Sequence, residues 1–495
     1  MAVFELILAL LLGGVALSLL APRLGVPWPV LLAGAGAGLA LVPGMPAVAL
    51  DPDLALALFV APILLDAAYD TSPRDLRANW APVVSLVLVA VGLTVAAVAV
   101  TAHALVPQMP WAAAVVLGAI VAPPDAAAAT AVLRQVRLPH RMMVVLEGES
   151  LLNDASALLV YRVGVGAVAG GLGLWTVPLL VLTVGGGIVL GIVLARLYLR
   201  ASASLPDGPA SVVMQFLGTF GVWLLAEALG VSAVLCVVAY GLSIARVTAG
   251  RTQARHRRNS YAVWEVAVFV LNVLAFVLIG LQLRGIVARL DGAVWQACVV
   301  AGTVLGVVVL VRMAWVACHG TVVRMLPRRE VGLIPTVQGG LIVGWCGMRG
   351  IVTLAAALAL PAGFPHRDLV VFTAFAVVLG TLVLQGLTLR PLLAWFAMPP
   401  DDSVARELDL ARAACTRAVL EVLQREPDSE ARQALQQDYA ARLDPAKEAP
   451  ALADLRRRAL ATERRTLLDL LRTGQIGEDA FHQLEEALDW SEAEA

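Results

Sequence analysis

Long apolar runs separated by short polar connections dominate the chain up to about residue 400. A helix needs roughly 20 apolar residues to cross the hydrocarbon core of a bilayer. The pattern therefore predicts an all-α polytopic membrane protein with about thirteen transmembrane helices. The expected spans, each end given to within a few residues, are 3–21, 28–43, 53–69, 81–105, 111–132, 142–166, 174–195, 209–229, 231–245, 261–283, 293–318, 334–360 and 368–394.

The pattern changes near residue 398, where apolar positions recur at helical spacing among many charged residues. This periodicity predicts amphipathic helices. We therefore divide the chain into a transmembrane domain, 1–398, and an acidic helical tail, 399–495. The tail shows no metal, nucleotide or nucleic-acid motif, so we expect a solvated appendage or a regulatory or dimer-supporting element. Its expected helices are 404–425, 431–442, 451–472 and 478–490.

Composition agrees with a membrane protein. The chain is 60% hydrophobic and only 15% charged, whereas soluble domains carry about 25% charged residues. These values exclude a soluble globular chain and a disordered one. Five cysteines in 495 residues, without zinc-like spacing, predict neither a disulfide nor a cysteine metal site. The first apolar run lacks a basic start and a small-residue cleavage site, which favours a retained span over a signal peptide.

Arginine is distributed unevenly among the connections between spans. Sixteen arginines lie in alternate connections, and the other connections carry only Arg284, Arg289 and Arg367. Cytoplasmic loops of membrane proteins carry the excess of basic residues. This asymmetry predicts a plasma-membrane protein with its N-terminus outside and its tail in the cytoplasm. The sixteen are Arg23, Arg74, Arg77, Arg134, Arg137, Arg141, Arg196, Arg200, Arg246, Arg251, Arg255, Arg257, Arg258, Arg324, Arg328 and Arg329.

Two consecutive spans carry carboxylates at membrane depth. The fifth contains Pro123, Pro124 and Asp125, and the sixth contains the run 147–154, Glu-Gly-Glu-Ser-Leu-Leu-Asn-Asp. A charged side chain at the bilayer centre costs ~2.5–3.5 kcal/mol on insertion scales. We therefore expect these carboxylates to share a polar cavity. The two prolines break the fifth helix, and irregular backbone is tolerated at this depth only where it lines a cavity or is buried in protein.

Four polar residues share one side of the sixth helix. Glu149 and Asn153 are four residues apart, as are Ser150 and Asp154, and the two pairs lie about 100° apart around the axis. Glu147 lies closer to the cytoplasmic end, where water could reach it. The spacing therefore predicts a polar face that meets the break in the fifth span.

The twelfth span has features of the fifth in the opposite orientation. It contains Gly339-Gly340 and the run 344–350, Gly-Trp-Cys-Gly-Met-Arg-Gly, so it is also interrupted and carries a lone charge. Interrupted spans in opposite orientation are typical of inverted-repeat transporters. We expect two six-helix repeats, spans 1–6 and 8–13, whose broken helices cross. Arg349 could offset the negative charge of the cluster or hold the broken helices together, and the sequence leaves both roles open.

Other spans carry isolated polar residues, which we expect to have structural partners rather than to bind a ligand. No histidine lies well inside a span, so proton chemistry would depend on carboxylates. These isolated residues are Glu227, Glu265, Asn272 and Arg312, while Asp66 and Asp70 end the third span.

The runs 122–125, Ala-Pro-Pro-Asp, and 146–154, Leu-Glu-Gly-Glu-Ser-Leu-Leu-Asn-Asp, resemble the sodium/proton exchangers of the monovalent cation:proton antiporter class, in its NhaP-like and NHE-like branch. The segment 345–361 looks like the family's Gly-x-Arg-Gly segment, and 276–283 is also similar. The resemblance covers about residues 1–395. It implies a homodimeric transporter in membrane lipid that is not an enzyme, needs no cofactor and binds no nucleic acid.

The resemblance also implies roles for individual residues. Asp154 would bind the transported cation and the proton, with Asn153 beside it. Asp125, Glu149 and Ser150 would hold or shape the cation site, so that the cation lies at Asp154 and Asp125.

One position departs from the family. Members usually have threonine before the aspartate of the broken helix, whereas this chain has Pro124 before Asp125. The proline offers its backbone carbonyl as a cation ligand but no hydroxyl. This difference leaves the preference among Na+, K+ and Li+ open.

A mechanism follows from simple competition. A carboxylate in a low-dielectric cavity resists ionisation and therefore holds a proton readily. The anionic form supplies oxygen ligands to a hard cation, so proton and cation compete for Asp154. Because Asn153 is neutral, one cation replaces one proton, which predicts electroneutral 1:1 exchange by alternating access. A second proton on Asp125 would make transport electrogenic, an alternative that only the resemblance argues against.

Two other classes of function remain for the same residues. A channel would need polar linings on several spans, whereas only two spans here are rich in acids. A membrane-embedded hydrolase would need a nucleophile with a base. Ser150 has no histidine at membrane depth, although Asp125 and Asp154 could imitate an aspartyl dyad.

Overall fold

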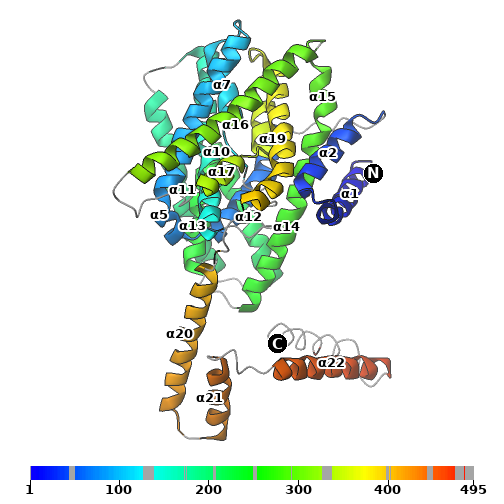
Figure 1. Cartoon of the computed structure of the whole chain (residues 1–495), viewed down its shortest axis with the longest axis vertical. Coiled ribbons are helices and arrows are strands. Elements are labelled where there is room, and N and C mark those ends of the chain that lie inside the picture. Colours follow the sequence, from blue (N-terminus) through cyan, green and yellow to red (C-terminus); the bar gives the residue numbers. More distant parts are fainter. Residues whose placement is uncertain are drawn as a thin grey trace. The chain divides into compact units, whose positions relative to one another are not determined.

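The computed structural model of the chain consists of helices throughout the part that it describes (Figure 1). This confirms the all-α class for that part. The end of the expected fifth span, 126–132, and the expected tail helix 478–490, apart from residue 484, lie outside it. The structure describes residues 2–43, 51–125, 139–171, 173, 176–203, 208–248, 254–290, 292–325, 337–396, 401, 403–427, 429–442, 450–473 and 484.

The helices fall into two compact units, Met1–Pro400 and Asp401–Ala495. In the second unit they are α20 (Ser403–Arg425), α21 (Glu430–Arg442) and α22 (Pro450–Arg472). In the first unit they are α1 (Ala2–Leu24), α2 (Trp28–Ala40), α3 (Pro52–Ala55), η1 (Leu56–Val60), α4 (Ala61–Asp70), α5 (Pro73–Ala78), α6 (Trp80–Val84), η2 (Ser85–Ala90), α7 (Val91–Leu105), α8 (Trp111–Val121), α10 (His140–Gly170), α11 (Thr176–Ser202), α12 (Pro209–Ala228), α13 (Ala233–Thr248), α14 (Ala254–Leu281), α15 (Leu283–Ala288), α16 (Val294–Met325), α17 (Val337–Trp345), α18 (Ile351–Leu358) and α19 (Arg367–Phe396).

Local sequence explains many helix ends. The side chain of Ser72 accepts a hydrogen bond from the backbone N–H of Asp75 and caps α5, which begins with Pro73. Helix α10 begins directly after Pro139 and ends before Gly171, whose φ of 89° is a conformation that glycine adopts without strain.

Nine helical stretches in the described part are long and apolar enough to cross a membrane. Three shorter apolar helices, α2, α8 and α13, coincide with further expected spans. The expected twelfth span corresponds to the pair α17 and α18. The chain is therefore a multi-pass membrane protein, and the full count of thirteen crossings stays a prediction. Helices α10, α11, α14 and α16 extend several residues beyond the expected ends, because helices continue past the apolar core that hydropathy detects.

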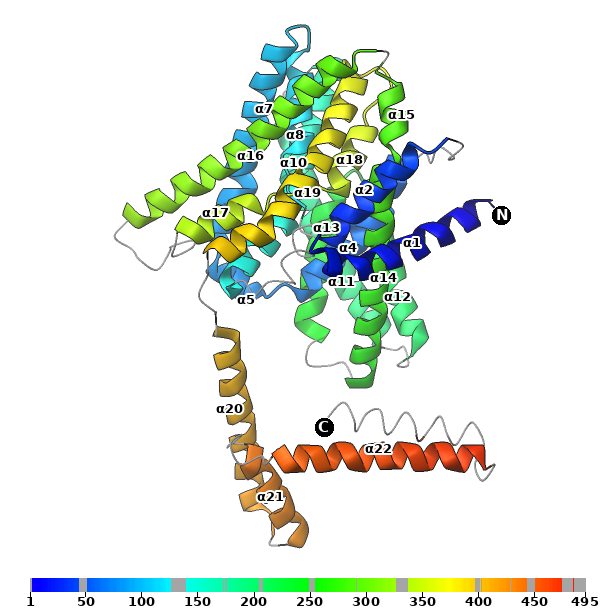
Figure 2. The same ribbon diagram turned by 45° about the vertical axis from the view of Figure 1, so that its right-hand side comes forward.

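The first unit contains two groups of helices. The first group consists of α1, α2, the α3–η1–α4 span and α11 to α14, with α2 packed on α14 and α13 packed on α4, α11 and α12. The second group consists of the α6–η2–α7 span, α8, α10 and α16 to α19. Figures 1 and 2 show α1, α2 and α14 side by side on one flank, and α7 and α16 together on another. The polar face of α10 belongs to the second group.

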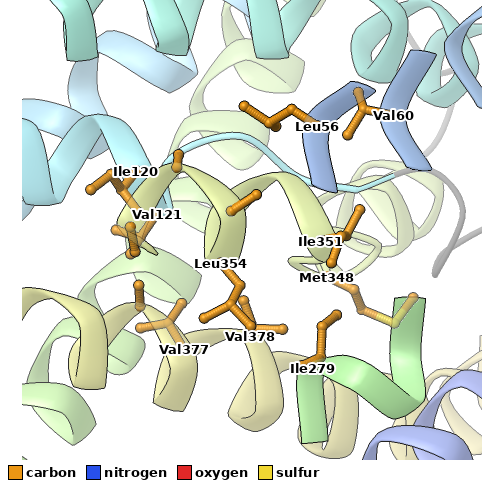
Figure 3. Packing of buried hydrophobic residues seen from close by; sticks show 14 of the residues in the cluster. Leu56, Val60, Ile120, Val121, Ile279, Met348, Ile351, Leu354, Val377 and Val378 are labelled. Atoms are coloured by element: carbon orange, nitrogen blue, oxygen red, sulfur yellow. The ribbon is translucent and has the colours of Figure 1, made fainter. Parts of the chain in front are cut away.

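Apolar packing surrounds the interrupted helices. In Figure 3 the side chain of Leu354 in α18 points toward Val377 and Val378 in α19. Val121, at the end of α8, lies beside α18. All four side chains are buried in one continuous cluster. This packing encloses the broken backbone in protein, which the bilayer requires of any non-helical segment at membrane depth.

Candidate functional site

The interruptions of the two broken spans meet. Helix α8 ends at Val121, and the proline pair follows. The backbone N–H of Asp125 donates a hydrogen bond of 2.7 Å to the carbonyl oxygen of Met348, which lies between α17 and α18. The sequence predicts that these two spans approach each other at their breaks, and the structure places them in direct contact.

Arg349 binds the end of α8. Its side chain is 1% exposed, and it donates hydrogen bonds to the carbonyl oxygens of Val121 (2.8 Å) and Ala122 (2.9 Å). Its backbone N–H donates to Oγ1 of Thr381 in α19 over 3.0 Å. The helix ends at Val121 and the backbone N–H of Asp125 bonds to Met348 instead of to Val121, so the guanidinium supplies donors that the terminal carbonyls of α8 lack. Of the two roles that the sequence leaves open, these contacts correspond to holding the broken helices together.

Arg312 of α16 has the same relation to the other broken span. It donates to the carbonyl oxygens of Gly344 (3.1 Å) and Val343 (3.2 Å) at the end of α17. A positive side chain is favourable at a helix C-terminus, where carbonyl oxygens lack partners. Two buried arginines therefore bind the C-terminal carbonyls of the two interrupted helices, one arginine for each.

The same Arg312 forms a two-pronged ion pair with Glu149. Its Nη1 lies 2.5 Å from Oε1 and its Nη2 lies 2.8 Å from Oε2. The side chains are 4% and 1% exposed. This pairing uses both carboxylate oxygens of Glu149. Arg312 of α16 therefore compensates the negative charge of Glu149 without a bound cation. The role in the cation site that the resemblance implies for Glu149 stays a prediction.

Asn153 and Asp154 lie where α10 passes the proline break. The amide nitrogen of Asn153 donates to the carbonyl oxygen of Pro124 over 2.7 Å. Its Oδ1 is buried and has no hydrogen-bond partner among the described residues. Asp154 is 7% exposed and follows Asn153 directly in the chain, as Asp125 follows Pro124. The Asn153–Pro124 bond therefore brings together the two segments that carry the aspartates, beside an unsatisfied amide oxygen.

A serine one turn along α10 supports this arrangement. The hydroxyl of Ser156 lies 2.8 Å from the carbonyl oxygen of Asn153 and 3.0 Å from that of Val87. Val87 belongs to η2, a π-helical turn, and such turns often occur at functional sites. Ser150, the remaining member of the predicted set, is half-buried on α10.

The structure thus brings Asp125, Asn153, Asp154 and the carbonyl of Pro124 together and directs Glu149 to Arg312. Sequence reasoning treats Arg312 as an isolated structural residue and does not identify its partner. The available signal is the lone arginine on an apolar span, because a buried charge is costly unless it is paired or hydrogen-bonded. The choice among several buried acids requires the packing of α16.

Comparison with known proteins identifies relatives of this chain. The family model described as "Sodium/hydrogen exchanger, transmembrane" matches residues 7–395. An uncharacterized Na+/H+ exchanger of Mycobacterium tuberculosis (strain ATCC 25618 / H37Rv) is 36% identical over 439 residues, covering 84% of this chain and 79% of that protein. A sodium, potassium, lithium and rubidium/H+ antiporter of Bacillus pumilus is 29% identical over 496 residues, covering 93% of this chain and 73% of that protein.

A solved structure shares the fold. The sodium proton antiporter MjNhaP1 from Methanocaldococcus jannaschii superimposes with a TM-score of 0.60 at 20% sequence identity, over 80% of this chain and 96% of that one. The family model covers most of the chain, and the motifs that suggest the family lie at the crossing of the broken helices. The chain belongs to the sodium/hydrogen exchanger family.

Proposed function

We propose that this protein exchanges a monovalent cation, with Na+ as first candidate and K+ or Li+ as alternatives, for a proton across the plasma membrane. The observation that carries the proposal is the buried Asp154 beside Asn153, whose Oδ1 has no partner among the described residues. A hard cation takes oxygen ligands. The oxygens of Asp154, Asp125 and Asn153 would supply them, and Ser150 and the carbonyl of Pro124 would complete the site.

Proton and cation would compete for the Asp154 carboxylate. Burial disfavours an empty, charged carboxylate, so the side chain would hold one or the other at all times. Transport then needs only that the site changes its accessible side when it is occupied. Asn153 is neutral, so one cation would replace one proton and exchange would be electroneutral.

The two groups of helices suggest the moving parts. The second group carries α10 and both broken helices, so it would move as a body against the first group and turn the site from one side of the membrane to the other. The paired arginines fix the ends of α8 and α17 within the second group. The protein would act as a homodimer with its N-terminus outside and its tail in the cytoplasm.

The experiment is transport in proteoliposomes with a pH-sensitive dye inside. An imposed gradient of Na+, K+ or Li+ should move protons saturably, and each cation is tested in turn. Asp154→Asn should abolish this movement, whereas Glu147→Gln, an exposed carboxylate on the same helix, should keep it. Size-exclusion chromatography checks that both variants fold.

The results would also separate the other classes of function. Cation flux without proton movement would indicate a channel, and cleavage of added peptide would indicate a hydrolase. Full exchange by Asp154→Asn would disprove the assigned role of that residue.

A further inference from the structure

Gly347 and Gly350 lie within the interruption between α17 and α18, and each faces a charged side chain from another part of the chain. A methyl group on Gly350 would overlap the carboxylate of Asp125 and lie 2.8 Å from its Cβ. A methyl group on Gly347 would lie 2.5 Å from Cδ and 2.6 Å from Nε of Arg312. Ordinary contacts of a methyl group begin at about 3.4 Å, so neither glycine leaves room for a side chain.

A left-handed backbone does not account for these glycines. Gly350 has a negative φ of −142°. Gly347 is absent from the described glycines with positive φ, which are Gly25, Gly171, Gly230 and Gly292. The missing side chains therefore matter for space, because a backbone or side chain can approach glycine more closely than any other residue.

We propose that Gly347 and Gly350 are positioning residues of the ion site, because their missing side chains form two slots that seat Arg312 and Asp125. This inference rests on the proposed function, since it concerns the placement of the same site. The first slot lets the Arg312 side chain reach Glu149 and the end of α17. The second slot holds the Asp125 carboxylate against Gly350, the residue that precedes α18.

Each slot positions a different side chain. Asp125 is already tied to this segment by its backbone bond to Met348, so its side chain cannot withdraw from an added methyl group without breaking that bond or turning away from Asp154. Arg312 is held by two carbonyls and two carboxylate oxygens. A methyl group on Gly347 would displace the ion pair, while one on Gly350 would displace a member of the cation site.

Three single variants test the proposal. Gly350→Ala should raise the KM for Na+ by about tenfold or more, because a site group that moves by about 1 Å loses its geometry. It should also reduce the increase in Tm that added Na+ produces. Gly347→Ala should lower the Tm measured without Na+ more than Gly350→Ala does. Gly340→Ala is the matched control in α17, since its methyl group would lie an ordinary 3.5 Å from Val316.

A double-variant comparison shows whether Gly350 acts through Asp125. In an Asp125→Gly background the carboxylate and its Cβ are both gone, so Gly350→Ala should leave Tm unchanged. If Gly350→Ala alone does not fold, the Asp125→Gly/Gly350→Ala protein should recover folding. An equal loss of Tm in both backgrounds, or a double variant that also fails to fold, would overturn the proposal.

The proposal and the proposed function fail in different ways. Wild-type protein that moves no protons would refute the exchange activity, while the coupling of Tm between positions 125 and 350 would still be measurable. Normal transport with a wild-type KM in Gly350→Ala would refute the positioning role alone.

Discussion

The side-chain amide of Asn153 donates a hydrogen bond to the backbone carbonyl of Pro124 over 2.7 Å. This bond ties α10, which carries Asp154, to the broken fifth span. It also orients the amide, because the nitrogen is engaged and the oxygen is left as an acceptor without a partner in the described part of the chain. One residue thus links two helices and offers an oxygen toward the proposed cation.

Replacing Asn153 by alanine should therefore weaken both stability and cation binding. Loss of the donor leaves the buried carbonyl of Pro124 unsatisfied, which costs about 1–3 kcal/mol. We expect a lower Tm in detergent and a higher KM for the cation in proteoliposomes. Asn272→Ala, a buried asparagine on α14, is the control and should leave KM unchanged. A wild-type KM in Asn153→Ala would show that the amide does not shape the site.

The Glu149–Arg312 pair should behave as one unit. Glu149→Gln leaves a buried guanidinium without its counter-charge, and breaking a buried pair in this way costs about 3–5 kcal/mol. Arg312→Met should be at least as destabilising, because it also releases the carbonyls at the end of α17. The double variant should lose less stability than the two single losses together.

Equilibrium unfolding in mixed micelles measures this coupling. Additive losses would mean that the two side chains do not depend on each other. If Glu149 were instead a cation ligand, Glu149→Gln would raise KM without lowering the Tm measured in the absence of cation.

Hydropathy places most of the long helices of the described part, because apolar length is set by bilayer thickness and does not depend on tertiary packing. The breaks were also readable: Pro123-Pro124 cannot continue a helix, and the run 344–350 is rich in glycine. The helix ends near water were missed by several residues, since α16 continues to Met325 beyond its apolar stretch. Hydropathy carries no information about that extension.

The site was predicted in part. Helical spacing placed Asn153 and Asp154 on a face toward the proline break, and Asn153 does bond to Pro124. Spacing could not reveal that Glu149, on the same face, turns to Arg312, which is 163 residues away in the chain. Local patterns identify which residues share a helix face, whereas the partner of a charge depends on which helix packs against that face.

Lysine should not be able to replace Arg349 in binding the end of α8. Its Nε and Nη2 each bind one carbonyl at the end of α8, and a single ammonium cannot reproduce this planar fork. A hydrogen bond to a charged group contributes about 1.5–3 kcal/mol, so Arg349→Lys should lower Tm and slow exchange. Arg289→Lys, at an exposed arginine, is the control. Wild-type Tm and rate in Arg349→Lys would mean that positive charge alone suffices there.

The proposed competition for Asp154 fixes how cation affinity depends on pH. Where the empty site holds a proton, binding one cation releases one proton, so the apparent KM should rise about tenfold for each unit by which pH falls. Dye-based transport assays at several pH values, equal on both sides at the start, measure this slope. A slope near a hundredfold per unit would mean that two protons leave, which would implicate Asp125 as well.

Membrane potential provides an independent measurement of the same stoichiometry. Moving one net charge through the membrane is worth about 2.3 kcal/mol per 100 mV, so an electrogenic exchanger must change its rate when a potassium gradient with valinomycin sets the potential. With Asn153 neutral and one proton exchanged per cation, no net charge crosses, and the Na+-driven rate should stay constant. The same potassium gradient without valinomycin separates exchange driven by K+ itself from an effect of the potential. Choline outside balances the ionic strength, and liposomes without protein measure the proton leak. A rate that follows the potential would refute 1:1 exchange while leaving Asp154 as the binding carboxylate.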